Sequence, residues 1–221
     1  YPGIHNIGFI IGYNEGNLIG CVNNADVKHY IATGQNYTVC HASMVGKQVG
    51  GMIQNCVNNG DVTGSGEHVG GIVGQIYHKN TKQTVNISNC TVLCDVIGGY
   101  TVGGIVGEYN PTHDETQMTM WNCASVEGEI VNAGYASSKW TMVGGLVGWA
   151  RMGNTYASLN IVNCFSDPAS IRCEFPDANE VDMGGLIGEQ AGANATVLIQ
   201  GCYTSLAPGR AVVNSNQNIP D

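Results

Sequence analysis

The sequence predicts an all-β protein, a parallel β-solenoid in the form of a three-sided β-helix of about six repeats. A glycine-rich core recurs along the chain, and each copy is followed by a hydrophobic strand that ends in Asn-Cys or Gly-Cys. The six cysteines at this position lie 33 to 41 residues apart and are Cys21, Cys56, Cys90, Cys123, Cys164 and Cys202. Self-similarity at such a period is typical of architectures in which each unit stacks on its neighbours.

The glycine core has the pattern hydrophobic-Gly-Gly-hydrophobic-hydrophobic-Gly, and its clear copies are residues 69–74, 102–107, 143–148 and 183–188. The first copy is degenerate, with Phe9 in place of the second glycine. In the second copy Ala42-Ser43 replaces both glycines. The nearby run Val49-Gly50-Gly51-Met52 resembles the core, but it lies too close to Cys56 to be in register with the other copies. Paired glycines favour a close approach of two backbones where one side of the solenoid is narrow.

A half-buried strand is predicted before each repeat cysteine, because apolar residues alternate there. The third residue upstream of each cysteine is Leu18, Ile53, Ile87, Met120, Ile161 and Ile199 in turn. The residue just before each cysteine is Asn or Gly, and both tolerate left-handed backbone geometry. We therefore expect a corner at this position, with asparagine side chains hydrogen-bonded along the stack.

A third β-prone piece follows each cysteine, as in Asp61-Val62-Thr63 and Glu129-Ile130-Val131. Three short strands per repeat predict a three-sided coil, and six coils stacked at the spacing of parallel strands give a rod on the order of 29 Å long. We expect residues 1–206 to form the repeats and residues 207–221 to form a terminal strand and a tail.

The six repeat cysteines are interpreted as small buried hydrophobic residues rather than as disulfides. Equivalent side chains in a parallel stack lie farther apart than the Cβ separation of roughly 3.8 Å that a disulfide prefers. The total of nine leaves at least one thiol free in any case. Cys40, Cys94 and Cys173 lie outside the column, and the sequence does not assign them a role.

Charge and hydropathy exclude some classes of partner. With 8 basic and 17 acidic residues the formal net charge is −9, which repels phosphate backbones, so we expect no nucleic-acid partner. No apolar run approaches the roughly 20 residues of a membrane span, so we expect no membrane insertion by this segment. The chain begins at Tyr1-Pro2, which suggests a processed or excised piece of a larger parent chain.

An acidic column is the first candidate for chemistry. Asp26, Asp61 and Asp95 each follow a repeat cysteine by five residues. Carboxylates stacked in this way raise one another's pKa and suit a glycosidase pair or a calcium site. The alternative, which we favour, is that each Asp closes a turn and points to solvent. The column breaks at the fourth repeat, where Glu129 appears one residue later, so we predict no metal site.

Aromatic residues after the glycine core are the candidates for ligand binding. Tyr13, Tyr77, Tyr109 and Trp149 all lie within three residues of a core, with Glu108 nearby as a hydrogen-bonding group. Aligned on one edge of a rod, they form a platform on which sugar rings stack. The alternative is that they cover bare glycine backbone.

Known catalytic motifs are missing from the sequence. No two histidines have the spacing of a zinc peptidase, and neither a nucleophile elbow nor a phosphate-binding loop is present. Cys-(two residues)-Cys zinc pairs are also missing. We therefore predict no catalytic residues and no cofactor.

The repeats resemble a known family, the Glug repeat, named for its Gly-Leu-(any)-Gly core. The resemblance rests on cores such as Val143-Gly144-Gly145-Leu146-Val147-Gly148 and on the tail Asn55-Cys56-Val57-Asn58-Asn59-Gly60-Asp61-Val62, and it covers roughly residues 4–206. Glug repeats occur in tandem in secreted and surface proteins of bacteria, including adhesin-like proteins and accessory regions of immunoglobulin A peptidases. The resemblance implies an extracellular location and a glycan or a host surface protein as partner.

Three functional hypotheses follow. The first is a non-catalytic surface module that acts as a rigid spacer and presents a binding edge in adhesion. The second is a carbohydrate-active β-helix enzyme, in which the Asp column or the loop acids Glu108, Asp114 and Glu115 act as acid and base. The third is an accessory domain that positions a distant peptidase domain.

Overall fold

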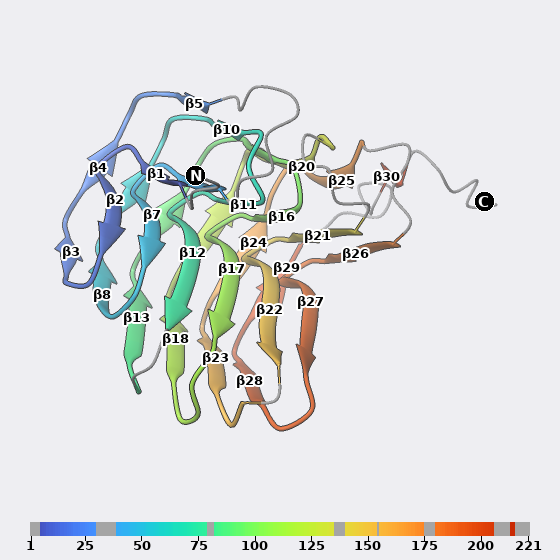
Figure 1. The fold of residues 1–221 in the computed structure, drawn as a ribbon. Helices are drawn as coiled ribbons and strands as arrows, with labels where there is room; N and C mark the ends of the chain where they lie inside the picture. The colour runs from blue at the N-terminus through green and yellow to red at the C-terminus, as the bar shows by residue number, and fades with distance from the viewer. Residues whose placement is uncertain are drawn as a thin grey trace.

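The structure is a computed structural model that describes residues 5–29, 39–78, 82–134, 140–153, 155–174, 180–205 and 213–214. It confirms the predicted parallel β-solenoid of about six coils (Figure 1). Every described strand pairs in parallel with the equivalent strand of a neighbouring coil. For example, Ile53, Ile87 and Met120 lie in register on three successive strands. Equivalent residues therefore form columns along the solenoid.

Five six-stranded parallel sheets, numbered here in the order in which the chain enters them, make up the described solenoid. Sheet 1 contains β1 (His5–Gly8), β6 (Val39–Ala42), β11 (His68–Gly70), β16 (Thr101–Gly103), β21 (Trp140–Gly144) and β26 (Glu180–Gly184). Sheet 2 contains β2 (Ile11–Asn14), β7 (Val45–Gln48), β12 (Val73–His78), β17 (Val106–Pro111), β22 (Val147–Gly153) and β27 (Ile187–Gly192). Sheet 3 contains β3 (Leu18–Ile19), β8 (Gly51–Gln54), β13 (Thr84–Ser88), β18 (Gln117–Trp121), β23 (Ser158–Val162) and β28 (Thr196–Gln200).

The last two sheets have the shortest strands. Sheet 4 contains β4 (Val22–Asn23), β9 (Val57–Asn58), β14 (Thr91–Val92), β19 (Ala124–Val126), β24 (Phe165–Asp167) and β29 (Tyr203–Thr204). Sheet 5 contains β5 (Val27–His29), β10 (Val62–Gly64), β15 (Val96–Gly98), β20 (Glu129–Asn132), β25 (Ser170–Cys173) and β30 (Val213–Asn214). Strand β30 belongs to the segment 207–221, and the rest of the expected tail lies outside the described residues.

Each coil contains five short strands, whereas the sequence analysis predicted three. The glycine core does not lie within one strand, because the chain bends there and the core contributes to the end of a sheet 1 strand and the start of a sheet 2 strand. The residues just after each repeat cysteine form an additional strand in sheet 4. The prediction missed this strand because a piece of two or three residues carries no readable alternation.

The glycine core is a place where backbone packs directly on backbone. A Cβ atom on Gly103 would lie 1.9 Å from the carbonyl oxygen of Val106 and 2.6 Å from the amide nitrogen of Gly148 in the next coil. A Cβ on Gly104 would lie 2.2 Å from the side-chain oxygen of Ser125. No side chain fits at either position, which confirms the close approach that the paired glycines predicted.

The corner before each repeat cysteine is also confirmed. Asparagine has a positive φ of 52° to 55° there, and glycine takes the same region in the first and last coils, at Asn55, Asn89, Asn122, Asn163, Gly20 and Gly201. The side-chain amide of Asn122 donates a hydrogen bond to Oδ1 of Asn89 over 2.9 Å. The expected asparagine ladder therefore runs along this corner.

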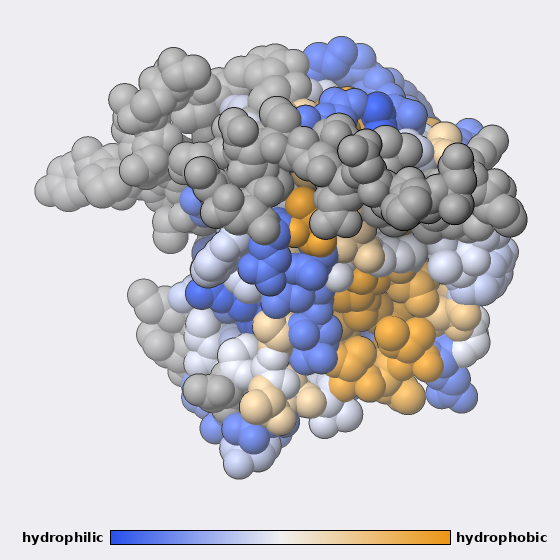
Figure 2. All heavy atoms as spheres, turned by 90° about the vertical axis from the view of Figure 1, so that its right-hand side faces the viewer, coloured by the Kyte–Doolittle hydropathy of each residue, from blue (hydrophilic) through white to orange (hydrophobic). Residues whose placement is uncertain are grey.

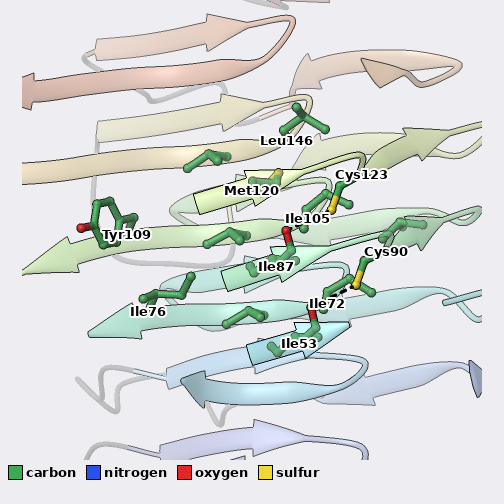
Figure 3. Close-up of a cluster of buried hydrophobic side chains, with 14 of the residues drawn as sticks. Ile53, Ile72, Ile76, Ile87, Cys90, Ile105, Tyr109, Met120, Cys123 and Leu146 are labelled. Carbon is green, nitrogen blue, oxygen red and sulfur yellow. Dashed lines mark hydrogen bonds between the residues drawn. The ribbon is translucent and has the colours of Figure 1, made fainter. Parts of the chain in front are cut away.

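All nine cysteines are free thiols, and the repeat cysteines point into the solenoid. Cys90 and Cys123 lie one above the other in the core, beside a column of isoleucines and Met120 (Figure 3). The Cys123 thiol contacts the carbonyl oxygens of Trp121 at 3.4 Å and Ile87 at 3.6 Å. Cys21 and Cys202 are only partly buried because they belong to the first and last coils. The interpretation as small buried hydrophobic residues is confirmed for the inner coils.

The two ends of the solenoid expose apolar side chains. Strands β26 to β29 are edge strands, so the inward-facing residues of the sixth coil have a neighbouring coil on one side only. Figure 2 shows an apolar patch on the side of the molecule where the sixth coil lies. Leu198, Ile199 and Tyr203 of this coil are exposed. The described part of the chain holds no helix with the length and apolarity of a membrane span.

Candidate functional site

The alternation of side chains after the glycine core decides which residues reach the surface of sheet 2. In β12, Val73 and Ile76 belong to the hydrophobic core, whereas Gln75 and Tyr77 point the other way. The first residue after the last glycine of each core therefore lies on the outer face. Its column along the sheet is Tyr13, Lys47, Gln75, Glu108, Trp149 and Glu189.

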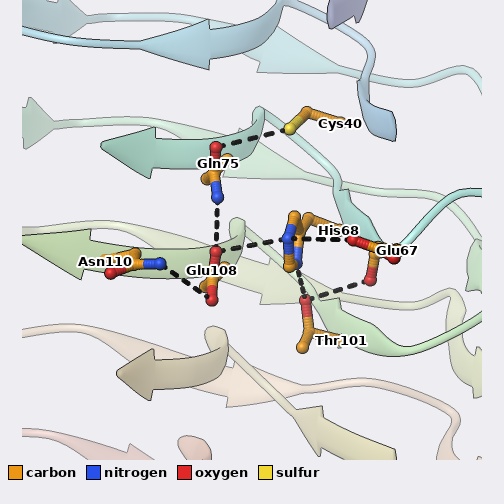
Figure 4. Close-up of polar contacts among 7 residues, drawn as sticks. All are labelled: Cys40, Glu67, His68, Gln75, Thr101, Glu108 and Asn110. Atoms are coloured by element: carbon orange, nitrogen blue, oxygen red, sulfur yellow. Dashed lines mark hydrogen bonds and ion pairs between the residues drawn. The ribbon is translucent and has the colours of Figure 1, made fainter. Parts of the chain in front are cut away.

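A second column comes from the outer face of sheet 1, where Cys40, His68 and Thr101 are in register on β6, β11 and β16. Because the chain bends at the glycine core, these residues face the column of sheet 2 across a concave corner. Figure 4 shows His68 of β11 pointing toward Glu108 of β17. The corner brings together residues that lie in different sheets and different coils.

Glu108 is the centre of a buried polar network. Its side chain is 0% exposed, and its Oε2 accepts a hydrogen bond from Nε2 of Gln75 over 2.5 Å. Nε2 of His68 lies 3.3 Å from the same oxygen, and Nδ2 of Asn110 donates to Oε1 over 3.4 Å (Figure 4). A buried carboxylate is costly unless it is hydrogen-bonded, and this one has partners from three other side chains.

His68 is itself held in place from its other side. Its Nδ1 lies 2.9 Å from Oγ1 of Thr101, and this hydroxyl contacts the backbone oxygen of Glu67 at 3.3 Å. The carboxylate of Glu67 lies 3.9 Å from Nε2 of His68. Two carboxylates, those of Glu67 and Glu108, therefore flank one imidazole ring.

Aromatic and basic side chains surround this network. Nζ of Lys47 lies 4.0 Å from the ring centre of Tyr77, and the Arg151 guanidinium lies 4.8 Å from that of Trp149. Tyr100 contacts the Trp149 ring edge to face, with 5.8 Å between ring centres. Together the two columns and their neighbours form a hollow of about 220 Å³. Its lining residues are Lys47, Glu67, His68, Gln75, Tyr77, Tyr100, Glu108, Asn110 and Arg151.

Three of the five predicted ligand-binding residues lie at or beside this hollow. Tyr77 and Glu108 line it, and Trp149 follows Glu108 in register in the next coil. Tyr13 lies on the same face but at the N-terminal end of the column, where it is 51% exposed and hydrogen-bonds to Glu15. Tyr13 is therefore separated from the hollow by the Lys47 position.

Tyr109 was wrongly placed on the predicted aromatic platform. It is the second residue after its core glycine, so alternation turns it inward, and its side chain is 0% exposed within the hydrophobic core. Its hydroxyl donates a hydrogen bond to the carbonyl oxygen of Ser158 over 3.1 Å, and burial raises the pKa of the phenol. Closeness to the glycine core in sequence did not reveal that Tyr109 is buried, because successive residues of a strand point to opposite faces.

The acidic column serves the backbone of neighbouring coils. Oδ1 of Asp26 accepts a hydrogen bond from the amide of Asp61 over 3.2 Å, and Oδ1 of Asp61 accepts one from the amide of Asp95 over 3.1 Å. Asp95 binds the amide of Glu129 in the same way over 2.8 Å. Within the ranges that the structure describes, no three His, Cys, Asp or Glu side chains gather as metal ligands would.

The other proposed acids lie away from the hollow. Oδ1 of Asp114 accepts a hydrogen bond from the amide of Tyr156 over 2.9 Å, and Glu115 forms an exposed ion pair of 2.6 Å with Lys82. Both acids lie between β17 and β18, past the opposite end of the strand from Glu108. Glu108 is therefore separated from the two acids with which the enzyme hypothesis grouped it.

Sequence reasoning missed most of the hollow, including His68, Lys47, Asn110 and Arg151. Lys47 and Gln75 occupy the same repeat position as Glu108, so alignment of the cores by their last glycine contains the signal for this column. His68 belongs to the strand before the core, and only the bend between sheets 1 and 2 brings it to Glu108.

Comparisons of the chain with protein-family models, with curated proteins and with solved structures found no match.

Proposed function

We propose that this chain is a non-catalytic extracellular repeat module of a bacterial surface or secreted protein. It acts in adhesion as a rigid spacer and presents the hollow between sheets 1 and 2 to a glycan or to a host surface protein. The remainder of a larger parent chain attaches the module to its cell or to the secreted protein. The resemblance of its cores and tails to Glug repeats supports the extracellular location.

The observation that carries the proposal is the use of repeated polar groups to hold coils together. The asparagine ladder and the acidic column both bind the next coil, and the glycine cores pack backbone on backbone. Such contacts repeat in register along the stack, which supports the proposed role as a rigid spacer. The polar hollow around Glu108 is set apart from these columns, because it is open to a ligand and lined by nine residues from both sheets.

Binding without turnover tests the proposal. The purified full chain is applied to an array of glycans and to immobilised host surface proteins, and bound oligosaccharides are recovered and analysed by mass spectrometry. The proposal predicts retention of at least one ligand with its covalent structure unchanged. Release of shortened oligosaccharides, or no retention on any surface, contradicts it.

One observation favours a second candidate, a carbohydrate-active enzyme. Glu67 and Glu108 both lie within 4 Å of His68 and both line the hollow. A pair of carboxylates that flank a bound sugar is the arrangement of glycoside hydrolases. Product release that disappears in the Glu67→Gln variant, with unchanged folding, supports this candidate over the non-catalytic module.

A further inference from the structure

We infer that the hollow between β11, β12 and β17 binds one neutral hexose residue of a glycan. This inference rests on the proposed binding function and names the ligand class and the residues that contact it. Four properties of the hollow lead to it, namely its size, its charge, its aromatic rings and the fixed geometry of its floor.

The size of the hollow limits the ligand to about one sugar ring. Its volume of about 220 Å³ is below the range of roughly 300–1,000 Å³ for pockets that enclose drug-sized ligands. The hollow is open to solvent on the side of Arg151, which is an exposed residue. A single ring can therefore enter while the rest of a glycan stays outside.

The charges of the lining favour a neutral ligand. Lys47 and Arg151 are basic, Glu67 and Glu108 are acidic, and their formal charges cancel. A lining of zero net charge gives no net attraction to an anion or to a cation, so a neutral ligand fits it. The side-chain amide of Asn110 can both donate and accept hydrogen bonds, as the hydroxyl groups of a sugar do.

The aromatic rings match the apolar face of a pyranose. Tyr77 and Tyr100 line the hollow and are partly exposed. Tyr100 is fixed against Trp149, and Lys47 lies over the Tyr77 ring at 4.0 Å. A rigid aromatic surface of this kind offers apolar contact to one face of a sugar ring.

The floor of the hollow is ordered before a ligand arrives. Glu108 is buried and binds Gln75, His68 and Asn110, so it positions these groups rather than contacting the sugar itself. Side chains that are already held in place lose little conformational entropy on binding. We therefore assign the direct contacts to Asn110, Tyr77 and Glu67, which are partly exposed at the rim.

The experiment measures binding of simple sugars to the full chain. Methyl glycosides of glucose, galactose and mannose are the neutral probes, and glucuronic acid and glycine are the charged and zwitterionic comparisons. Binding is detected by saturation-transfer NMR and quantified by titration. Asn110→Ala and Tyr77→Ala change the rim. Asn160→Ala on β23 and Tyr13→Ala on β2 are the matched controls, because neither residue lines the hollow.

We expect at least one neutral glycoside to bind with a dissociation constant in the millimolar range. Each rim variant weakens it about tenfold, the size of one lost contact of about 1.4 kcal/mol. The two control variants bind as the unaltered chain does. Urea unfolding of all four variants shows that a loss of binding does not come from a loss of fold.

Three results overturn the inference. The first is that no neutral glycoside binds, and the second is that glucuronic acid or glycine binds more tightly. The third is that the rim variants bind as tightly as the controls. In each case retention of a larger glycan or a host protein by the unaltered chain leaves the proposed adhesion function standing, whereas loss of all retention removes that function as well.

Discussion

The side-chain amide of Asn89 donates a hydrogen bond to Oδ1 of Asn55, the equivalent residue of the preceding coil, over 3.1 Å. Both residues have a positive φ, of 52° at Asn89 and 55° at Asn55. One residue type therefore meets two requirements, since asparagine tolerates the left-handed backbone at the corner and also links consecutive coils.

Substitution of this corner residue separates the two contributions. Asn89→Ala loses both the hydrogen bonds and the backbone tolerance, and we expect it to lower the free energy of unfolding by about 2 kcal/mol. Asn89→Gly keeps the backbone tolerance, so we expect a smaller loss of about 1 kcal/mol. Urea unfolding measures the free energies of both variants. Asn160→Ala is the control, because Asn160 lies on β23 of sheet 3, the sheet whose strands end just before this corner. Equal losses for Ala and Gly would contradict the requirement for positive φ.

The glycine core makes the sharpest prediction about stability. In Gly103→Ala the new Cβ would lie 1.9 Å from the Val106 carbonyl oxygen, which is backbone and cannot move aside. We expect a loss of more than about 4 kcal/mol, enough to unfold many domains of this kind. In the control Gly16→Ala the nearest atom is 3.7 Å away, so stability should change by less than about 1 kcal/mol. Circular dichroism and urea titration compare them, and a folded, stable Gly103→Ala protein would refute the backbone packing.

The cysteines predict a protein that does not depend on redox conditions. All nine are free thiols, and burial raises the pKa of Cys94 and of Cys40 to about 12. Because the thiolate is the reactive form, these two thiols react slowly at neutral pH in the folded state. We expect a reductant to leave the melting temperature unchanged. We also expect a thiol reagent to count nine reactive thiols in protein unfolded in guanidinium with no reductant present. A count below nine in unreduced, denatured protein would reveal disulfides.

Two buried histidines predict a loss of stability in acid. Burial lowers the pKa of His78 to about 4, and burial together with the neighbouring His29 lowers the pKa of His41 to about 3. Neither ring nitrogen of His78 has a hydrogen-bond partner among the described residues. The unfolded chain binds protons near a pKa of about 6.5, so acid favours the unfolded state.

Stability should therefore be complete above about pH 7 and fall as the pH drops below about 6.5, down to about pH 4 for His78 and about pH 3 for His41. The loss at pH 5 should be about 2 kcal/mol for each histidine. His78→Phe removes one titrating group from a position beside the Tyr109 ring, so its urea midpoint should change less between pH 7.5 and 5. An identical pH dependence in the variant and the unaltered chain would exclude His78 as a cause.

The parts of the fold that could be predicted from the sequence are those fixed by backbone geometry. Gly103 and Asn89 are required by a close approach and by a positive φ, and such requirements recur as the same residue type in each repeat. The sheet 4 strand of each coil could not be predicted, because a strand of two residues such as Val57–Asn58 shows no alternation.

The candidate site was less accessible to sequence reasoning, because it depends on register between coils. His68 and Glu108 are 3.3 Å apart, although they belong to different sheets and to consecutive coils. Tyr109 shows the opposite error, since it lies near the core in sequence but on the inward side of its strand. The outer-face column that contains Glu108 can be recognised only when the alternation of side chains along each strand is combined with the register between coils.

The measurement that tests the central claim most directly is the pattern of backbone nuclear Overhauser effects in isotope-labelled protein. Parallel stacking in register places Asn86 beside Thr119 and Thr119 beside Asn160. We predict interstrand contacts between the backbone protons of these pairs. We predict the same contacts between Gln75 and Glu108 at the hollow. Antiparallel hairpin contacts, or no contact between residues one repeat apart, would contradict the stacked coils and the hollow that they form.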